Sequence, residues 1–344
     1  MTTTGAETPR SPANASIEDV ARRAGVSSGT VSRALRGLPN VSETTRARVI
    51  AAATELNYTV SPSASSLASG RMSTIGVITP FVSRWFFAQA INGVEEVLHE
   101  ANFDLVLYID EDGKTFQSLP MRRKVDGVLL LTLPSDSPDV SGVRNLGVPV
   151  GSLHVDIEGF SSVLIDDVGG SSMATDHLLA LGHRRIAMVT LDQHPSVPFR
   201  TGQDRSEGYL RSLKAAGIEV DPLLIVNGES TVEGGMRAGS ELLSRAPRPT
   251  AIFVQSDEMA MGVLYIIRRA GLHCPEDISV VGFDDHELSN VFDLTTVAQP
   301  ARAQGALLAH HVLDQVRLGS APQTTTLKTH LVIRGTTAPP PSGI

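Results

Sequence analysis

From Thr74 onward, apolar runs of strand length alternate with segments of helical character. Near-continuous apolar strands joined by helices form parallel sheets that are covered on both faces. A first set of runs spans 75–80, 103–109, 125–131 and 148–153, and a second set spans 185–191, 223–227, 251–256 and 278–284. The two sets predict an α/β core of two doubly wound lobes, in which ligands bind at the carboxyl ends of the strands.

Helices are expected between the runs, at 85–101, 168–181, 204–216, 232–244 and 257–270. A late run at 294–300 leads into one more helical segment at 301–317, which implies that the chain crosses between the lobes more than once. The carboxyl ends of both sheets can then face one cleft. The connection at 111–124 is short for a full crossover and contains Pro120, so its helix is expected to have only a turn or two.

The composition limits the classes of protein that remain. The chain contains one cysteine, Cys274, which excludes an internal disulfide and a cysteine-rich zinc site and fits a reducing cytoplasm. No apolar run is long enough to span a bilayer. Residues 1–15 carry no secretory signal and are expected to form a disordered tail, and residues 336–344 are expected to form a second tail.

Charge is distributed unevenly along the chain. Residues 1–71 contain eight arginines and five acidic residues, so their charge of +3 leaves −11 for the remainder of a chain whose total is −8. A basic segment on an acidic body is typical of a protein that binds nucleic acid. Ordinary scatter of surface charge is the alternative.

The basic segment contains signals for three short helices. Ser16 and Asp19 can form a capping box, Gly25 can end the first helix, and Ser27 can cap the second. The positions expected to be apolar and buried are Ile17, Val20, Ala21, Ala24, Val31, Ala34, Leu35, Val49, Ile50, Ala53 and Leu56. Short helices joined by tight turns, with A-G-V-S as the first turn, predict an all-α helix-turn-helix domain over 16–60.

The second helix of such a domain enters the DNA major groove with its N-terminus first. Ser28 and Gly29 then lie at the tip, where small residues permit close approach, and Arg33 can donate two hydrogen bonds to a guanine. Phosphate contacts are expected from hydroxyl residues at helix N-termini, namely Ser27, Thr30 and Ser42. The alternative is a helical hairpin whose serines only cap helices.

This segment resembles the DNA-binding domain of the LacI/GalR (lactose/galactose repressor) family. The matching motifs are D-V-A, A-G-V-S, T-V-S-R-A-L, V-S-x-x-T-R-x-R-V and E-L-N-Y, which cover Ser16 to Tyr58 without a gap. The resemblance implies a transcriptional repressor that binds a palindromic operator as a homodimer. It also implies that a small effector changes the affinity for the operator.

The next segment, 61–72, is small and polar and is expected to be a hinge. In the resembling family this hinge folds into a short helix on operator DNA, and a leucine enters the minor groove. By that resemblance Ala64 and Leu67 contact DNA, and an apolar wedge of this kind bends the duplex. The alternative for Leu67 is a buried anchor of the linker. The family's Pro-Asn ahead of the hinge is Val60-Ser61 here, which leaves the start of the helix open.

Residues 73–335 resemble the effector-binding core of the same family and, more distantly, the periplasmic sugar-binding proteins. The motifs are H-L-L-A-L-G-H-R-R-I-A, D-E-M-A-M-G and P-E-D-I-S-V-V-G-F-D-D. The resemblance implies that Asp284 and Arg205 hold a sugar-like effector, since a carboxylate accepts from vicinal hydroxyls and a guanidinium donates a rigid fork. The other effector contacts that it implies are Phe86, Phe87, Asp166 and Ser256.

Several positions depart from the family pattern. Ser256 replaces a frequent asparagine, Asp167 replaces the asparagine of an Asp-Asn pair, and Ser230 stands where an aromatic residue is common. Trp85 is a further candidate for ligand contact. Without the resemblance, Asp284 reads as a turn cap and Arg205 as one partner of a surface ion pair.

Two other classes of function compete with a regulator. A binding or transport component would have a signal peptide and would not need the helix-turn-helix segment. An enzyme is disfavoured because the chain has no G-x-S-x-G, P-loop, H-E-x-x-H or G-x-G-x-x-G motif. We therefore expect a cytoplasmic regulator with operator DNA and a carbohydrate effector as partners, and with no catalytic residue, metal, cofactor or membrane partner.

We predict that Arg33→Ala relaxes base preference at one position of each operator half-site and weakens binding by about 1–3 kcal/mol. The reason is that a bidentate guanidinium discriminates guanine from the other bases. Competition between duplexes that differ at single positions measures this effect. Unchanged selectivity would remove Arg33 from base reading.

Overall fold

The computed structural model describes residues 15–58, 72–110, 121, 124–132, 139–191 and 200–341. The chain divides into two compact units, Met1–Met72 and Ser73–Ile344, which are described separately. Ala64 and Leu67 of the hinge, and most of the short connection at 111–124, lie outside the described residues.

The first unit contains three short helices, α1 (Ile17–Ala24), α2 (Ser28–Leu35) and α3 (Glu43–Glu55). Their N-termini are capped as predicted, because the hydroxyls of Ser16, Ser27 and Ser42 accept from backbone N–H groups of the first turn. Asp19 completes the capping box with Ser16, and Gly25 ends α1 in the left-handed conformation at φ 66°. The helix boundaries are therefore set by local side-chain chemistry.

The core of this unit confirms most of the predicted apolar positions but corrects one. Ile50 is 49% exposed, although it was expected in the core. The buried stripe of α3 runs through Val49, Ala52 and Ala53, so Ile50 lies one position further round the helix and faces solvent. Arg46 of α3 donates to the carbonyl oxygens of Ala34 and Leu38 and so ties α3 to the end of α2.

The second unit contains two six-stranded sheets, one in each lobe. The first sheet has the order β11-β5-β4-β3-β1-β2 and comprises β1 (Thr74–Thr79), β2 (Asp104–Ile109), β3 (Gly127–Leu130), β4 (Val150–Leu153), β5 (Ser161–Ile165) and β11 (Thr324–Leu327). The second has the order β12-β10-β9-β8-β6-β7 and comprises β6 (Ile186–Thr190), β7 (Ile225–Asn227), β8 (Ala251–Val254), β9 (Ser279–Asp284), β10 (Thr295–Ala298) and β12 (His330–Val332). The neighbouring strands are parallel except β10 and β12, which confirms the two doubly wound lobes.

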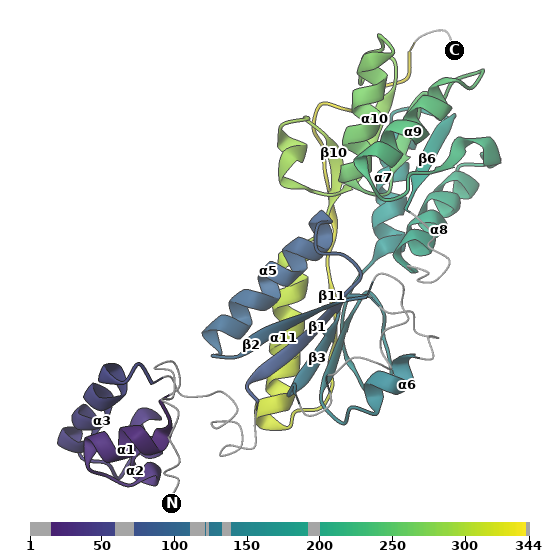
Figure 1. The fold of residues 1–344 in the computed structure, drawn as a ribbon. Coiled ribbons are helices and arrows are strands. Elements are labelled where there is room, and N and C mark those ends of the chain that lie inside the picture. The colour runs from purple at the N-terminus through teal and green to yellow at the C-terminus, as the bar shows by residue number, and fades with distance from the viewer. Residues whose placement is uncertain are drawn as a thin grey trace, which may run out of the picture. The chain divides into compact units, whose positions relative to one another are not determined.

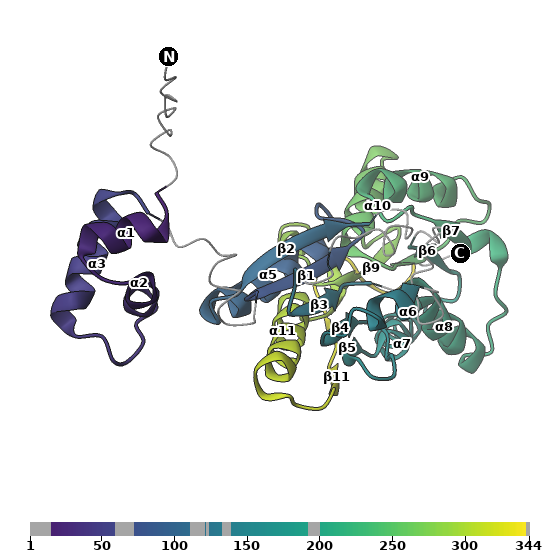
Figure 2. The ribbon, with the colours of Figure 1, turned by 60° about the horizontal axis from the view of Figure 1, so that its bottom comes forward.

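Helices cover both faces of each sheet. In the first lobe, α5 (Trp85–Glu100) and α11 (Ala301–Leu318) lie side by side on one face, and α6 (Asp139–Arg144) packs on the other (Figure 1). In the second lobe, α7 (Asp167–Ala180) and α8 (Arg200–Ala215) lie on one face, opposite α9 (Val232–Leu243) and α10 (Asp257–Arg269) (Figure 2). Two short 3-10 helices, η1 (Pro222–Leu224) and η2 (Glu287–Asn290), complete the second lobe.

Along the described residues, the chain crosses between the lobes three times. The crossings follow β5, β10 and β11, so that α11 and β11 return to the first lobe after β6 to β10 have formed the second. The prediction of more than one crossing is confirmed. The sequence patterns had not indicated β5, β11 or β12, which are short and carry polar residues.

The end of the core differs from the tail expected from residue 336 onward. Thr336 is buried, accepts from the backbone N–H of Thr295 and donates to the carbonyl of Val280. Ala338 exchanges hydrogen bonds with Ser279, and its carbonyl also contacts the ring of His183. Residues 336–338 therefore pack against the second lobe.

Two glycines let α5 and α11 approach closely. A Cβ atom added to Gly93 would lie 1.9 Å from the carbonyl oxygen of Arg302, and one added to Gly305 would lie 2.0 Å from that of Ala90. These distances are far below van der Waals contact, so the two helix backbones touch through the glycines. The contact fixes the face of the first sheet that α5 covers.

We predict that Gly305→Ala lowers the free energy of unfolding of the second unit by about 1–3 kcal/mol, because the added methyl group forces the helices apart. Gly142→Ala is the matched control, since no atom lies within 4 Å of the added Cβ on α6. That variant should be neutral or more stable by about 0.5–1 kcal/mol. Denaturant unfolding of both variants measures the difference, and equal stabilities would contradict the helix contact.

Candidate functional site

A cavity lies between the two lobes of the second unit. Its apolar wall is formed by Phe81, Phe86, Phe87, Leu131 and Leu191. Its polar groups come from both lobes and comprise Arg84, Thr132, His154, Thr201, Arg205, Ser230, Ser256, Glu258, Asp284 and Gln299. An apolar wall with a few convergent polar groups is the usual form of a small-molecule site.

Arg205 is the central cation of this cavity. It lies on α8 and is 2% exposed, and its Nε donates to Oδ1 of Asp167 at 2.8 Å. Its Nη1 donates to the carbonyl oxygen of Gln255 at 2.5 Å and lies 3.6 Å from Oδ1 of Asp284. The guanidinium also stacks 3.6 Å above the ring of Phe283. These contacts hold the guanidinium group of Arg205 in one orientation, which suits a group that must recognise a ligand.

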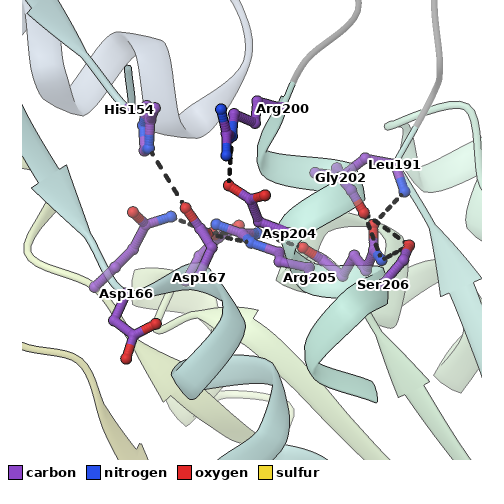
Figure 3. Close-up of polar contacts among 12 residues, drawn as sticks. His154, Asp166, Asp167, Leu191, Arg200, Gly202, Asp204, Arg205 and Ser206 are labelled. Carbon is purple, nitrogen blue, oxygen red and sulfur yellow. Dashed lines mark hydrogen bonds and ion pairs between the residues drawn. The ribbon is translucent and has the colours of Figure 1, made fainter. Parts of the chain in front are cut away.

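Asp167 balances the charge of Arg205 from the start of α7. Figure 3 shows its carboxylate beside Arg205, with His154 approaching from the first lobe. The distance from Nδ1 of His154 to Oδ2 of Asp167 is 3.8 Å, too long for a direct hydrogen bond. Burial acts to raise the pKa of Asp167, but the charge of Arg205 and the contacts with His154 outweigh it and hold the pKa below its usual range. Asp167 and Arg205 therefore form an ionised pair.

Asp284 is the second buried carboxyl group, at the carboxyl end of β9. It is 6% exposed and accepts from Nε2 of Gln299 at 2.6 Å. Burial raises the pKa of Asp284 to about 8, while the charge of Arg205 opposes this rise and that of Asp257 adds to it. Asp284 and Asp285 both have positive φ, 131° and 58°. Two successive strained residues are costly unless the surroundings enforce them, and such residues cluster at functional sites.

The cavity brings together five of the six residues predicted to contact an effector: Phe86, Phe87, Arg205, Ser256 and Asp284. Ser256 also caps α10. The sixth, Asp166, is not among the residues that line the cavity. It is exposed and caps α7, where its carboxylate accepts from the backbone N–H of Gly169 at 2.7 Å.

Several lining residues were missed from the sequence, and Trp85 lies elsewhere. His154 follows β4 and Gln299 follows β10, so the rule that ligands bind at the carboxyl ends of strands could have indicated both. Arg84 lies over the ring of Phe81 at 4.6 Å, and its Nη1 is buried without a hydrogen-bond partner. Trp85 does not line this cavity and instead stacks on His286 at its edge.

The first unit presents a second candidate surface on α2. Four of the predicted residues on or beside α2 are exposed, namely Ser27, Ser28, Gly29 and Arg33. Thr30 is half-buried. Exposed Ser42 caps α3. Nε of Arg33 donates to the carbonyl oxygen of Gly29 at 3.2 Å in the same helix. The predicted DNA-contacting residues of this unit are thus exposed or half-buried, with Ser27 and Ser42 at the N-termini of α2 and α3 and Arg33 in the last turn of α2.

Two further classes of site are absent from the described ranges. No helix there has the length and apolar character needed to cross a membrane. No group of three His, Cys, Asp or Glu side chains there is placed to hold a metal ion.

Comparison with known proteins matches both units. The family described as "Bacterial regulatory proteins, lacI family" matches residues 16–61, and the "Periplasmic binding protein-like domain" matches residues 175–337. The HTH-type transcriptional regulator CelR of Thermobifida fusca is 35% identical over 333 residues, 92% of this chain and 97% of the relative. The HTH-type transcriptional repressor CytR of Escherichia coli (strain K12) is 36% identical over 338 residues, 94% of this chain and 96% of the relative.

Solved structures agree with these relatives. The complex of CelR with cellobiose has a TM-score of 0.70 at 33% identity and covers 94% of this chain and 100% of its own. The Lac repressor dimer bound to operator and the anti-inducer ONPF has a TM-score of 0.83 at 28% identity and covers 94% of this chain and 99% of its own.

We predict that Asp284→Asn changes the pH dependence of stability. Between the ordinary pKa of 3.8 and a folded value of about 8, the folded protein holds a proton that the unfolded chain has released. The stability of the natural protein should therefore fall relative to that of Asp284→Asn as the pH rises through this window.

Melting temperatures at pH 5 and 8.5 measure the difference. Gly142→Ala, which changes no titratable group, is the control, and its difference from the natural protein should not change with pH. If the difference between Asp284→Asn and the natural protein does not change with pH, Asp284 titrates as in an unfolded chain.

Proposed function

The chain belongs to the LacI family of bacterial regulatory proteins, and we propose that its second unit binds a carbohydrate effector that changes the affinity of its first unit for operator DNA. The protein is a sequence-specific DNA-binding transcriptional regulator and not an enzyme. Its relatives over almost the whole chain are regulators. A cytoplasmic location follows from a function on chromosomal DNA.

The observation that carries this proposal is the buried Arg205 between Asp167 and Asp284, at one wall of a cavity that both lobes form. A guanidinium held by its neighbours and a carboxyl group beside it can donate to and accept from adjacent hydroxyl groups. The rings of Phe86 and Phe87 can pack on the apolar face of a sugar ring. A carbohydrate presents both kinds of surface at once.

The relatives support this class of effector. The solved structures include CelR with cellobiose and a LacI-family regulator of Enterococcus faecium with bound ribose. The latter is 29% identical to this chain with a TM-score of 0.70. Arg84, Ser230 and Ser256 also line the cavity and present polar groups to such a ligand.

On DNA, we propose that two copies of the chain bind a palindromic operator. Arg33 reads a base in the major groove of each half-site, with Ser28 and Gly29 at the tip of the helix. Residues 61–72 form the hinge, with Ala64 and Leu67 in the minor groove at the operator centre. The Lac repressor structure, a dimer on its operator, supports this arrangement.

An effector changes operator affinity only if it prefers one arrangement of the lobes. A cavity whose walls come from both lobes provides that preference, because its groups converge on a ligand only at one separation of the lobes. We propose that the protein represses transcription either with the effector bound or without it, but not in both states.

The first test is selection of bound duplexes from a random DNA library with the full-length protein. An enriched palindrome with a flexible central step is the expected result. Failure to enrich any sequence, with and without cellobiose or ribose, would contradict the regulator function.

We predict that Asp284→Ala binds the selected operator with normal affinity but no longer responds to the effector. The effector is identified as the sugar, from a panel that includes cellobiose and ribose, that raises the melting temperature of the natural protein and shifts its operator affinity. Titration of the protein–operator complex with that sugar measures the response. Asp166→Ala, whose side chain lies outside the cavity, should respond normally, and a normal response of Asp284→Ala would mean that the effector binds elsewhere.

A further inference from the structure

The first turn of α5 faces a carboxyl group of the opposite lobe. Arg84 stands at the N-cap position, but its side chain makes no capping hydrogen bond. The backbone N–H of Trp85 faces the carboxyl group of Glu258, which belongs to α10 of the second lobe, and it opposes the rise that burial causes in the pKa of Glu258. N–H groups in the first turn have no partner within their helix, and a carboxylate is a favourable partner for them.

The side chain of Trp85 makes two more contacts across the same gap. Its ring stacks on that of His286, with the ring centres 5.2 Å apart and the planes inclined by 28°. Its indole Nε1 donates to the carboxylate of Glu287, at the start of η2. The Glu287 side chain is 63% exposed, so this contact lies at the outer edge of the cleft.

From these contacts, we propose that Trp85 is a positioning residue, and that with Glu258, His286 and Glu287 it forms a cross-lobe latch that holds the lobes at the separation seen in this structure. Opening the cleft breaks the stack on His286 and the hydrogen bond to Glu287 together, and it moves the carboxyl group of Glu258 away from the N-terminus of α5. The latch acts in the protein without ligand, so the inference does not depend on the proposed effector or operator.

The latch also determines the shape of the cavity that it borders. Arg84, Phe86 and Phe87 flank Trp85 on the same helical turn, and all three line the cavity. Glu258 lines the cavity and also faces the backbone N–H of Trp85 at the start of α5. Trp85 therefore positions the aromatic wall without touching a ligand, and a ligand that contacts Glu258 acts on the latch directly.

A distance measurement between the lobes tests this inference. Spin labels are attached to cysteines introduced at Glu100 of α5 and Arg269 of α10, both exposed, in a Cys274→Ser background. Labelled protein is diluted with unlabelled protein so that each measured distance lies within one chain. Pulsed electron paramagnetic resonance then compares the natural sequence with Trp85→Ala and Trp85→Phe, with no sugar and no DNA present.

One narrow distance distribution is expected for the natural sequence. Trp85→Ala should add a population with a longer distance between the two spin labels. Losing the stack and the indole hydrogen bond lowers the ratio of closed to open molecules about ten-fold or more. Trp85→Phe keeps an aromatic ring but loses the N–H donor, so its shift should be smaller. Val82→Ala, at an exposed position in the loop before α5, is the control and should leave the distribution unchanged.

An unchanged distribution in Trp85→Ala would overturn the latch. If Trp85→Ala does not fold, as judged by circular dichroism, Glu287→Ala removes only the exposed acceptor and should shift the distribution in the same direction by a smaller amount. No shift in that variant and in Trp85→Phe would likewise overturn the inference. Operator selection and effector binding are separate measurements, so failure of the proposed function would leave this result intact.

Discussion

The buried charge of Arg205 is the interaction around which the second lobe's side of the cavity is arranged. A guanidinium that is 2% exposed must be paired and hydrogen-bonded, and here Asp167, the carbonyl of Gln255 and the ring of Phe283 surround it. Because Asp167 already neutralises Arg205, the charge of Arg205 stabilises the ionised form of the neighbouring Asp284 less. Burial therefore raises the pKa of Asp284 to about 8. The result is a site with one fixed ion pair and one carboxyl group that can gain or lose a proton near neutral pH.

The features that the sequence predicted well are those that local chemistry decides. Ser16, Ser27 and Ser42 cap helices because a side-chain oxygen satisfies N–H groups of the turn beside it, wherever the helix lies in the fold. Long apolar runs predicted the central strands for a similar reason, since a strand buried on both faces must be apolar throughout. Asp284 and Arg205 were placed by resemblance to a family, and the structure brings both to the cavity.

The features that were missed depend on contacts between distant parts of the chain. The strands β11 and β12 read T-T-T-L and H-L-V, and only pairing with β5 and β10 makes them strands. Ile50 shows the same limit, because a helix of weak amphipathicity does not reveal which side faces its neighbours. The role of Trp85 could not be foreseen either, since its partners lie about 200 residues further along the chain.

The three crossings between the lobes also affect how the chain can fold during synthesis. One face of the first lobe's core contains Leu308, Ala309 and Val312 of α11, and the edge of its sheet is β11. A ribosome makes these residues only after the entire second lobe up to β10. Until then Ile75, Val77 and Leu129 are covered by α5 alone, and a partly covered sheet face of this kind is prone to aggregation. The lobe made first is therefore completed last.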